Sequence, residues 1–146
     1  MNLENIEKNS LDSETNLLET VSENLKNTTH IQLPFSHWVY DKVFPENIAD
    51  ELLKLSFETP KIEYYTGKRE SNNQTRVFFN KENCEKFKVI NNVVEVFNNS
   101  KIIDQLGNLC GKDLTKGKLR IEYTMDTGDF WLEPHLDIKE KLLTFL

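Results

Sequence analysis

The sequence has few cysteines and lacks any long apolar run. Cys84 and Cys110 are the 2 cysteines among 146 residues, and they form no C-x-x-C pair. Two isolated thiols do not supply the disulfide framework of a small secreted domain. No apolar stretch approaches the ~20 residues of a membrane-spanning helix, and the N-terminus lacks the basic-then-apolar pattern of a signal peptide. We therefore expect a reduced, cytoplasmic protein that has no membrane partner.

Basic residues are also scarce. The chain has 18 Lys and Arg residues against 24 Asp and Glu residues, which gives a formal net charge of −6. Nucleic-acid binding depends on clustered Lys and Arg residues that release counterions from the phosphates. The one dense basic cluster has the pattern of a solvated loop and strand start, and it comprises Lys112, Lys116, Lys118 and Arg120. We therefore expect no nucleic-acid partner. The length and the 38% hydrophobic content fit one domain with a core.

Residues 1–30 differ in composition from the rest of the chain. They are rich in Asn, Glu, Ser and Thr, with one apolar stripe at helical spacing, formed by Leu17, Leu18, Val21 and Leu25. This composition predicts a polar N-terminal arm or a loose amphipathic helix. We place the domain itself at residues 31–146.

Apolar residues spaced three and four apart predict three helices in this domain. The first carries Ile48, Leu52 and Leu55; the second carries Phe87, Ile90, Val94 and Phe97; and the third carries Ile102, Ile103 and Leu106. Pro45 suits the first turn of the first helix. The third helix is expected to end near Gly107 or Gly111, because glycine readily adopts the left-handed conformation that closes a helix.

Extended segments are predicted between and after these helices. Apolar and aromatic density indicates strands over 31–40 and 76–79, with a loop over 58–75 between them. Residues 119–125 alternate apolar and polar, which is typical of a half-buried strand. Residues 142–146 are apolar on both faces, as in a central buried strand. The expected core residues are Leu52, Phe87, Ile90, Val94, Leu119, Ile121 and Leu143.

The predicted C-terminal strand has no following strand with which to pair. An unpaired apolar strand invites association with other chains. We therefore expect that the sequence is the front part of a larger domain, and that copies of it can associate through this strand.

His135 and Asp137 form the strongest functional signal. Side chains two apart on an extended chain point to the same face, so an imidazole nitrogen and a carboxylate oxygen can meet at one metal ion. They make up two-thirds of the facial triad of two histidines and one carboxylate that binds non-haem Fe(II). No histidine follows Asp137. His30 and His37 lie far upstream and have the pattern of ordinary strand or loop residues.

The segments around this pair resemble the Fe(II)- and 2-oxoglutarate-dependent oxygenases of the prolyl-4-hydroxylase-like family. They are Leu119-Arg-Ile-Glu-Tyr-Thr-Met125, Gly128-Asp-Phe-Trp-Leu-Glu-Pro-His-Leu-Asp137 and Lys141-Leu-Leu-Thr-Phe-Leu146. The strand-then-helix pattern from Leu33 to Leu53 also looks like the opening of these domains. The resemblance covers residues 31–146 and is strongest from residue 119 onward.

This resemblance implies a fold and a function. The expected fold is α+β, a partial double-stranded β-helix of the jelly-roll or cupin-like type with packed N-terminal helices. The expected activity is that of a dioxygenase, which uses Fe(II) and 2-oxoglutarate, with ascorbate as a candidate reductant, to hydroxylate a small molecule or peptide. The chain stops before the family's distal His and the basic residue that anchors 2-oxoglutarate. The alternative is a non-catalytic remnant or a metal- or ligand-binding jelly-roll fragment.

The resemblance also suggests roles for individual residues. His135 and Asp137 are the expected metal ligands. Tyr123 corresponds to a tyrosine that hydrogen-bonds 2-oxoglutarate, although a tyrosine packed in the core is the competing interpretation. The remaining candidates would pair with a carboxylate, line the cavity or wall the site, and they are Lys139, Lys141, Arg120, Thr144, Phe130 and Trp131.

Overall fold

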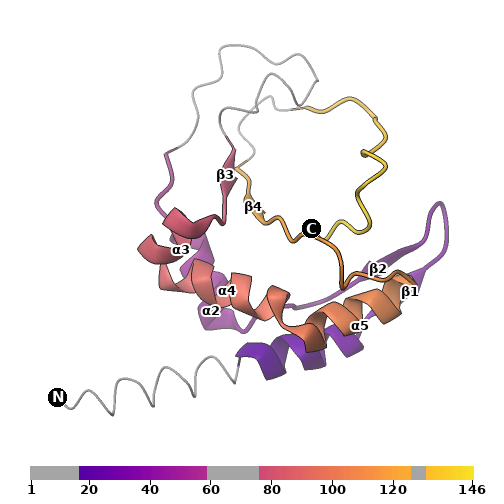
Figure 1. Cartoon of the computed structure of the whole chain (residues 1–146), viewed down its shortest axis with the longest axis horizontal. Coiled ribbons are helices and arrows are strands. Elements are labelled where there is room, and N and C mark those ends of the chain that lie inside the picture. The colour runs from indigo at the N-terminus through magenta and orange to yellow at the C-terminus, as the bar shows by residue number, and fades with distance from the viewer. Residues whose placement is uncertain (1–16, 59–75, 126–130) are drawn as a thin grey trace.

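The computed structural model describes residues 17–58, 76–125 and 131–146, and these contain helices and short strands (Figure 1). Residues 17–26 form a helical segment. After it come β1 (Thr29–Ile31), β2 (His37–Val39), α2 (Glu46–Leu53), β3 (Val77–Phe78), α3 (Lys81–Lys86), α4 (Lys88–Asn98), α5 (Ser100–Cys110) and β4 (Glu122–Tyr123). Apart from Glu58, the predicted loop over 58–75 lies outside the described residues, as does the N-terminal arm before Leu17.

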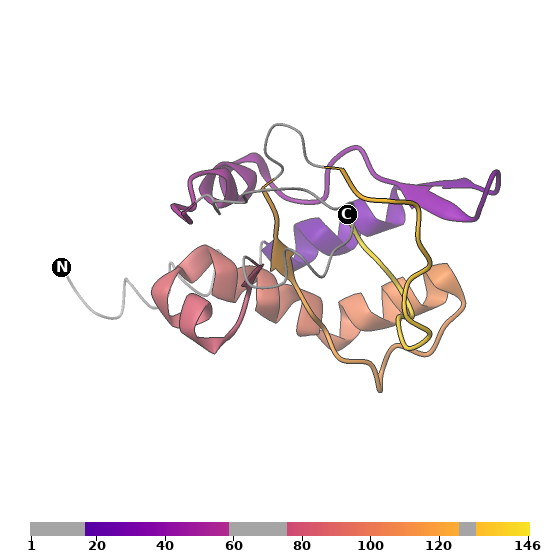
Figure 2. The ribbon, with the colours of Figure 1, turned by 90° about the horizontal axis from the view of Figure 1, so that it is seen from above.

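The core lies between the helical segment 17–26, α2, α4 and α5. The N-terminal stripe turns inward, so that Val21 is fully buried together with Ile90 of α4 and Ile102 of α5. Figures 1 and 2 show the helical segment running beside α5. A hydrogen bond joins the two, because the side-chain amide of Gln105 donates to the main-chain oxygen of Ser22 at 3.1 Å. The helical segment is therefore packed into the core.

The three helices predicted from apolar spacing are confirmed as α2, α4 and α5. Pro45 precedes the first residue of α2, where its missing N–H has no partner to lose. The side chain of Asn99 caps α5 by accepting a hydrogen bond from the N–H of Lys101 at 3.0 Å. Of the two predicted end points, Gly111 closes α5 with φ of 64°. Gly107 lies within α5, and a Cβ there would lie 2.8 Å from the Lys112 carbonyl oxygen.

The single strand predicted over 31–40 is wrong. The chain instead forms a β-hairpin in which β1 pairs antiparallel with β2, with His30 opposite Trp38. Pro34 lies in the connection between the strands, where the missing N–H costs no ladder hydrogen bond. The apolar density that indicated one long strand is thus divided between two short strands and an exposed turn containing Leu33 and Phe35.

β3 and β4 form a second antiparallel pair, with Phe78 opposite Glu122. The predicted alternation is confirmed at Ile121 and Tyr123, which are half-buried and pack against the core. Leu119 is 44% exposed, so its assignment to the core is wrong. It precedes the paired residues of β4, where no neighbouring strand holds the chain against the core. Ile90 is fully buried. The remaining expected core residues pack at the margin of the cluster, and they are Leu52, Phe87, Val94, Ile121 and Leu143.

Residues 131–146 contain no strand, so the strands predicted around His135 and over 142–146 are not formed. A turn at 139–140 separates two irregular stretches. Side chains still alternate after it, because Leu143 and Phe145 pack against the core while Leu142 and Leu146 are exposed. The ring of Phe145 lies 5.4 Å from that of Tyr40. A strand needs a hydrogen-bonded neighbour, and the described residues provide none for this segment.

Among the described residues the strands form two separate two-stranded sheets. Neither sheet closes on itself. The jelly-roll, which needs two larger packed sheets, stays a prediction for this chain. Within the same residues no helix is both long enough and apolar enough to span a bilayer.

Candidate metal centre

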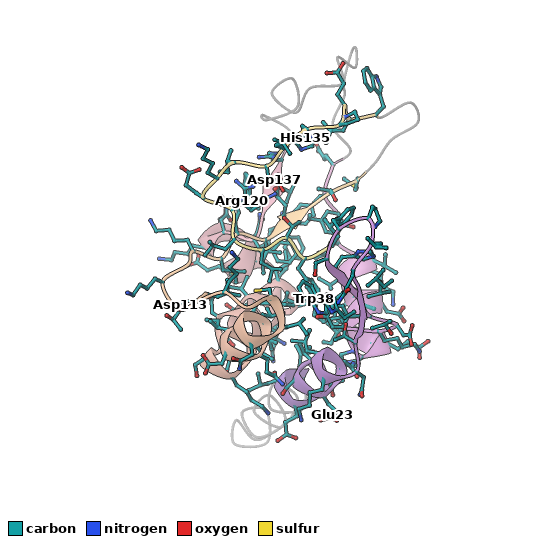
Figure 3. All side chains as sticks on the ribbon, turned by 90° about the vertical axis from the view of Figure 1, so that its right-hand side faces the viewer. Glu23, Trp38, Asp113, Arg120, His135 and Asp137 are labelled. Atoms are coloured by element: carbon teal, nitrogen blue, oxygen red, sulfur yellow. The ribbon has the colours of Figure 1, made fainter. Side chains whose placement is uncertain are left out.

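His135 and Asp137 lie on the irregular stretch that precedes the turn at 139–140, and both side chains are exposed (Figure 3). Pro134 restricts the backbone just before the pair. Leu136 between them is 96% exposed and Ile138 after them is 69% exposed, so neither of these apolar side chains packs against the core. Both candidate ligands are therefore accessible to an ion from solution.

A main-chain contact orients the imidazole of His135. Its Nδ1 lies 2.9 Å from the carbonyl oxygen of Glu133. Because a carbonyl oxygen can only accept, Nδ1 must be the donor in this hydrogen bond. In the neutral imidazole the lone pair is then on Nε2. Metal-bound histidines in proteins are commonly held by such a hydrogen bond from the other ring nitrogen.

Asp137 carries the carboxylate of the pair, and Lys141 holds it. The Nζ of Lys141 lies 2.9 Å from Oδ1 of Asp137, and the two side chains are 23% and 45% exposed. The sequence suggested that Lys141 or Lys139 pairs with a carboxylate. For Lys141 that carboxylate is the candidate metal ligand itself, so the ammonium group and a metal ion would compete for the same carboxylate.

A third ligand is not found where the structure describes the chain. Across residues 17–58, 76–125 and 131–146, no group of three His, Cys, Asp or Glu side chains could hold a metal ion. His30 belongs to the hairpin, where it stacks on Trp38 at 4.9 Å and contacts the hydroxyl of Ser36 at 2.7 Å. His37 contacts the carbonyl oxygen of Phe35 at 2.8 Å. Neither histidine joins His135 and Asp137.

The other predicted site residues within the described part of the chain either pack against the core or are exposed. Tyr123 packs its ring 5.4 Å from that of Phe57, as expected for a tyrosine packed against the core. Thr144 and Lys139 are exposed, and Trp131 is 48% exposed. Phe130 lies outside the described residues.

Arg120 takes part in an ion network that the sequence analysis missed. Its Nη2 lies 3.6 Å from Oε2 of Glu122, whose other oxygen is 2.9 Å from Nε of Arg76. The alternation of apolar and polar residues along the predicted strand could have indicated this network. Residues 120 and 122 share the polar face of one strand, and residue 76 precedes the strand that pairs with it.

The environments of Cys84, Asp113 and Tyr40 shift the pKa values of these side chains. Burial raises the pKa of the Cys84 thiol, and the nearby carboxylates of Glu95 and Glu85 act in the same direction. This thiol is therefore kept protonated, which disfavours a role as a nucleophile. Hydrogen bonds from Thr115 lower the pKa of the exposed Asp113. Burial likewise raises the pKa of Tyr40.

No model of a protein family matches this chain, and no curated protein or solved structure matches it either. Fold alone does not determine function. The chemistry and geometry of the residues at the site are therefore the basis for the functional interpretation.

Proposed function

We propose that His135 and Asp137 are two of the three Fe(II) ligands of a 2-oxoglutarate-dependent dioxygenase domain, and that residues 31–146 form the N-terminal part of its jelly-roll. The observation that carries this proposal is the orientation and tautomer of the His135 imidazole. Its Nδ1 donates a hydrogen bond to the carbonyl oxygen of Glu133, and its ring is exposed, as is the carboxylate of Asp137 two residues later. Neutral Nε2 and a carboxylate oxygen are ligands that suit Fe(II).

Bound Fe(II) would supply the activation of oxygen for hydroxylation of a substrate C–H bond, with 2-oxoglutarate as the co-substrate. The chain's own residues contribute orientation and charge. The Glu133 carbonyl oxygen fixes the tautomer of His135. Asp137 supplies a carboxylate, which Lys141 also contacts. The proposed substrate is a small molecule or a peptide.

The alternative is a jelly-roll fragment that binds metal or ligand without catalysis. The number of ligands favours it for this chain in isolation, because the described residues offer His135 and Asp137 without a third partner. The two functions share the same metal pair and differ in turnover. Metal binding therefore tests the pair, and turnover separates the two functions.

We expect the full chain to bind one Fe(II) ion, and His135→Ala to weaken that binding at least about tenfold, because a ligand is lost together with its pre-organised geometry. Binding can be measured by anaerobic calorimetry. His37→Ala is the matched control, since it removes a histidine whose ring nitrogen also contacts a main-chain oxygen two residues earlier. Equal binding by the wild-type chain and His135→Ala would contradict the assignment.

Lys141→Met should strengthen Fe(II) binding, because the metal no longer has to displace an ammonium group from Asp137. An exposed ion pair contributes about 0.2–1 kcal/mol, so the expected gain is a factor of up to about five. Lys139→Met removes the same charge from the exposed position two residues away and controls for the net charge of the chain. A gain of the same size in both variants would show that Lys141 does not compete with the metal.

A further inference from the structure

The outward face of the β3–β4 pair gathers charged residues around one aromatic ring. Because Phe78 lies opposite Glu122 and side chains alternate along each strand, Arg76 and Arg120 project from the same face as these two residues. The opposite face carries Phe79, Ile121 and Tyr123, which pack against the core. The two arginines therefore flank the Phe78–Glu122 pair, one on each side.

The charges on this face do not balance. Two guanidinium groups share the single carboxylate of Glu122, which among the described residues is the one acidic side chain in an ion pair with either arginine. Arg76 holds it at 2.9 Å, and these two side chains are 18% and 19% exposed. Arg120 stays at 3.6 Å and is 53% exposed. Arg76 therefore neutralises Glu122, and the charge of Arg120 is left over.

Phe78 helps to hold both guanidinium groups in place. The central carbon of each guanidinium lies 5.9 Å from the centre of the Phe78 ring. A cation at this distance is attracted to the face of the ring. Held in this way, Arg120 loses less freedom when it binds a ligand. Within the described part of the chain, most of its five N–H donors face no acceptor at hydrogen-bonding distance.

We propose that Arg120, supported by Phe78 and Arg76, binds a small carboxylate anion on this face. A planar carboxylate matches the fork of N–H donors on a guanidinium and can accept two parallel hydrogen bonds. It would complete a set of two guanidinium groups and two carboxylates. A large polyanion does not fit, because the net charge of the chain is −6. This proposal uses neither His135 nor Asp137.

The competing explanation is that the ion network only ties β3 to β4. The two explanations differ in what Glu122 does. In a purely structural network Glu122 is needed and no anion binds. In the proposed site Glu122 competes with the ligand for Arg120, so its removal should make anion binding stronger.

The test is a titration of the full chain with acetate at constant ionic strength, in which the Nε–H signals of Arg76 and Arg120 are followed by NMR. We expect Arg120→Gln to lower the association constant for acetate at least about tenfold. Lys118→Gln removes the same charge from an exposed residue two positions away and should change it less than about twofold. Equal losses in the two variants would mean that acetate senses only the general basic charge, which would overturn the proposal.

Glu122→Gln should raise the association constant severalfold, and added acetate should then raise its thermal midpoint more than that of the wild-type chain. Weaker binding in this variant, or no acetate binding by the wild-type chain, would also overturn the proposal. A parallel titration with phosphate distinguishes the anions, since tighter binding of phosphate than of acetate would reject a carboxylate site. Repeating the acetate titration on His135→Ala should give an unchanged constant, so failure of this site and failure of the metal site can be told apart.

Discussion

Ile90→Ala should lower the free energy of unfolding by about 2–5 kcal/mol, the range for truncating a large aliphatic side chain in a close-packed core. Ile90 is 0% exposed on α4 and belongs to the cluster shared with the helical segment 17–26 and α5. The neighbouring helices cannot close fully around the lost atoms, so a cavity adds to the lost burial. Urea denaturation of the wild-type chain and the variant measures the difference.

Leu53→Ala is the matched control, because Leu53 also lies on a helix but is 78% exposed. Its substitution should change the free energy of unfolding by less than about 0.5 kcal/mol. Ile121→Ala should fall between the two, since Ile121 is half-buried at the margin of the core. Similar losses for Ile90→Ala and Leu53→Ala would contradict the assignment of the core to this cluster.

The helices were predictable because their signal is local. The stripe of Ile48, Leu52 and Leu55 lies within two turns of chain, and burying that stripe places α2 on the core. For the same reason, the sequence limited the predicted end of α5 to one of two glycines, Gly107 or Gly111. The choice between them depended on tertiary contacts, because Gly107 packs against the chain that follows α5.

The strands were less predictable because a strand depends on its partner. The residues after 141 alternate in burial as a strand would, yet no described strand lies beside them. The 31–40 segment looked like one strand, although the chain reverses near Pro34 and pairs with itself. The hydrophobic pattern of a segment indicates which of its faces is buried. It does not indicate which other segment forms backbone hydrogen bonds with it.

The candidate site was predicted from the spacing of His135 and Asp137 in the sequence. The His-x-Asp spacing identified two residues that are both exposed. It could not identify the contacts that set their chemistry, which are the Glu133 carbonyl oxygen at His135 and the Lys141 ammonium at Asp137. The network of Arg76 with Glu122 was also missed, because its two members are far apart in sequence and meet only through the register of β3 and β4.

The purified chain should show no oxygenase turnover, although it contains His135 and Asp137. Within residues 17–58, 76–125 and 131–146 the pair has no third ligand beside it, and two ligands in place of three hold Fe(II) weakly and leave its geometry unconstrained. A site in which a ligand is missing cannot hold metal and 2-oxoglutarate in the alignment that the reaction requires. Succinate formed from 2-oxoglutarate in the presence of Fe(II) and ascorbate is the measured product, and we expect the same background rate for the wild-type chain and for His135→Ala.

Asp137→Ala and His37→Ala complete this experiment. If the chain makes succinate above background, loss of that activity in His135→Ala and Asp137→Ala but not in His37→Ala would mean that the metal pair is competent and that another residue completes the site. Loss in His37→Ala as well would identify the hairpin histidine as the third ligand, which would require the hairpin to move, because in the present structure His37 forms no metal-binding group with the pair. Either result would contradict the expected lack of turnover. Background rates in all four proteins, together with Fe(II) binding that depends on His135, would agree with a metal pair that needs a third ligand before it can support catalysis.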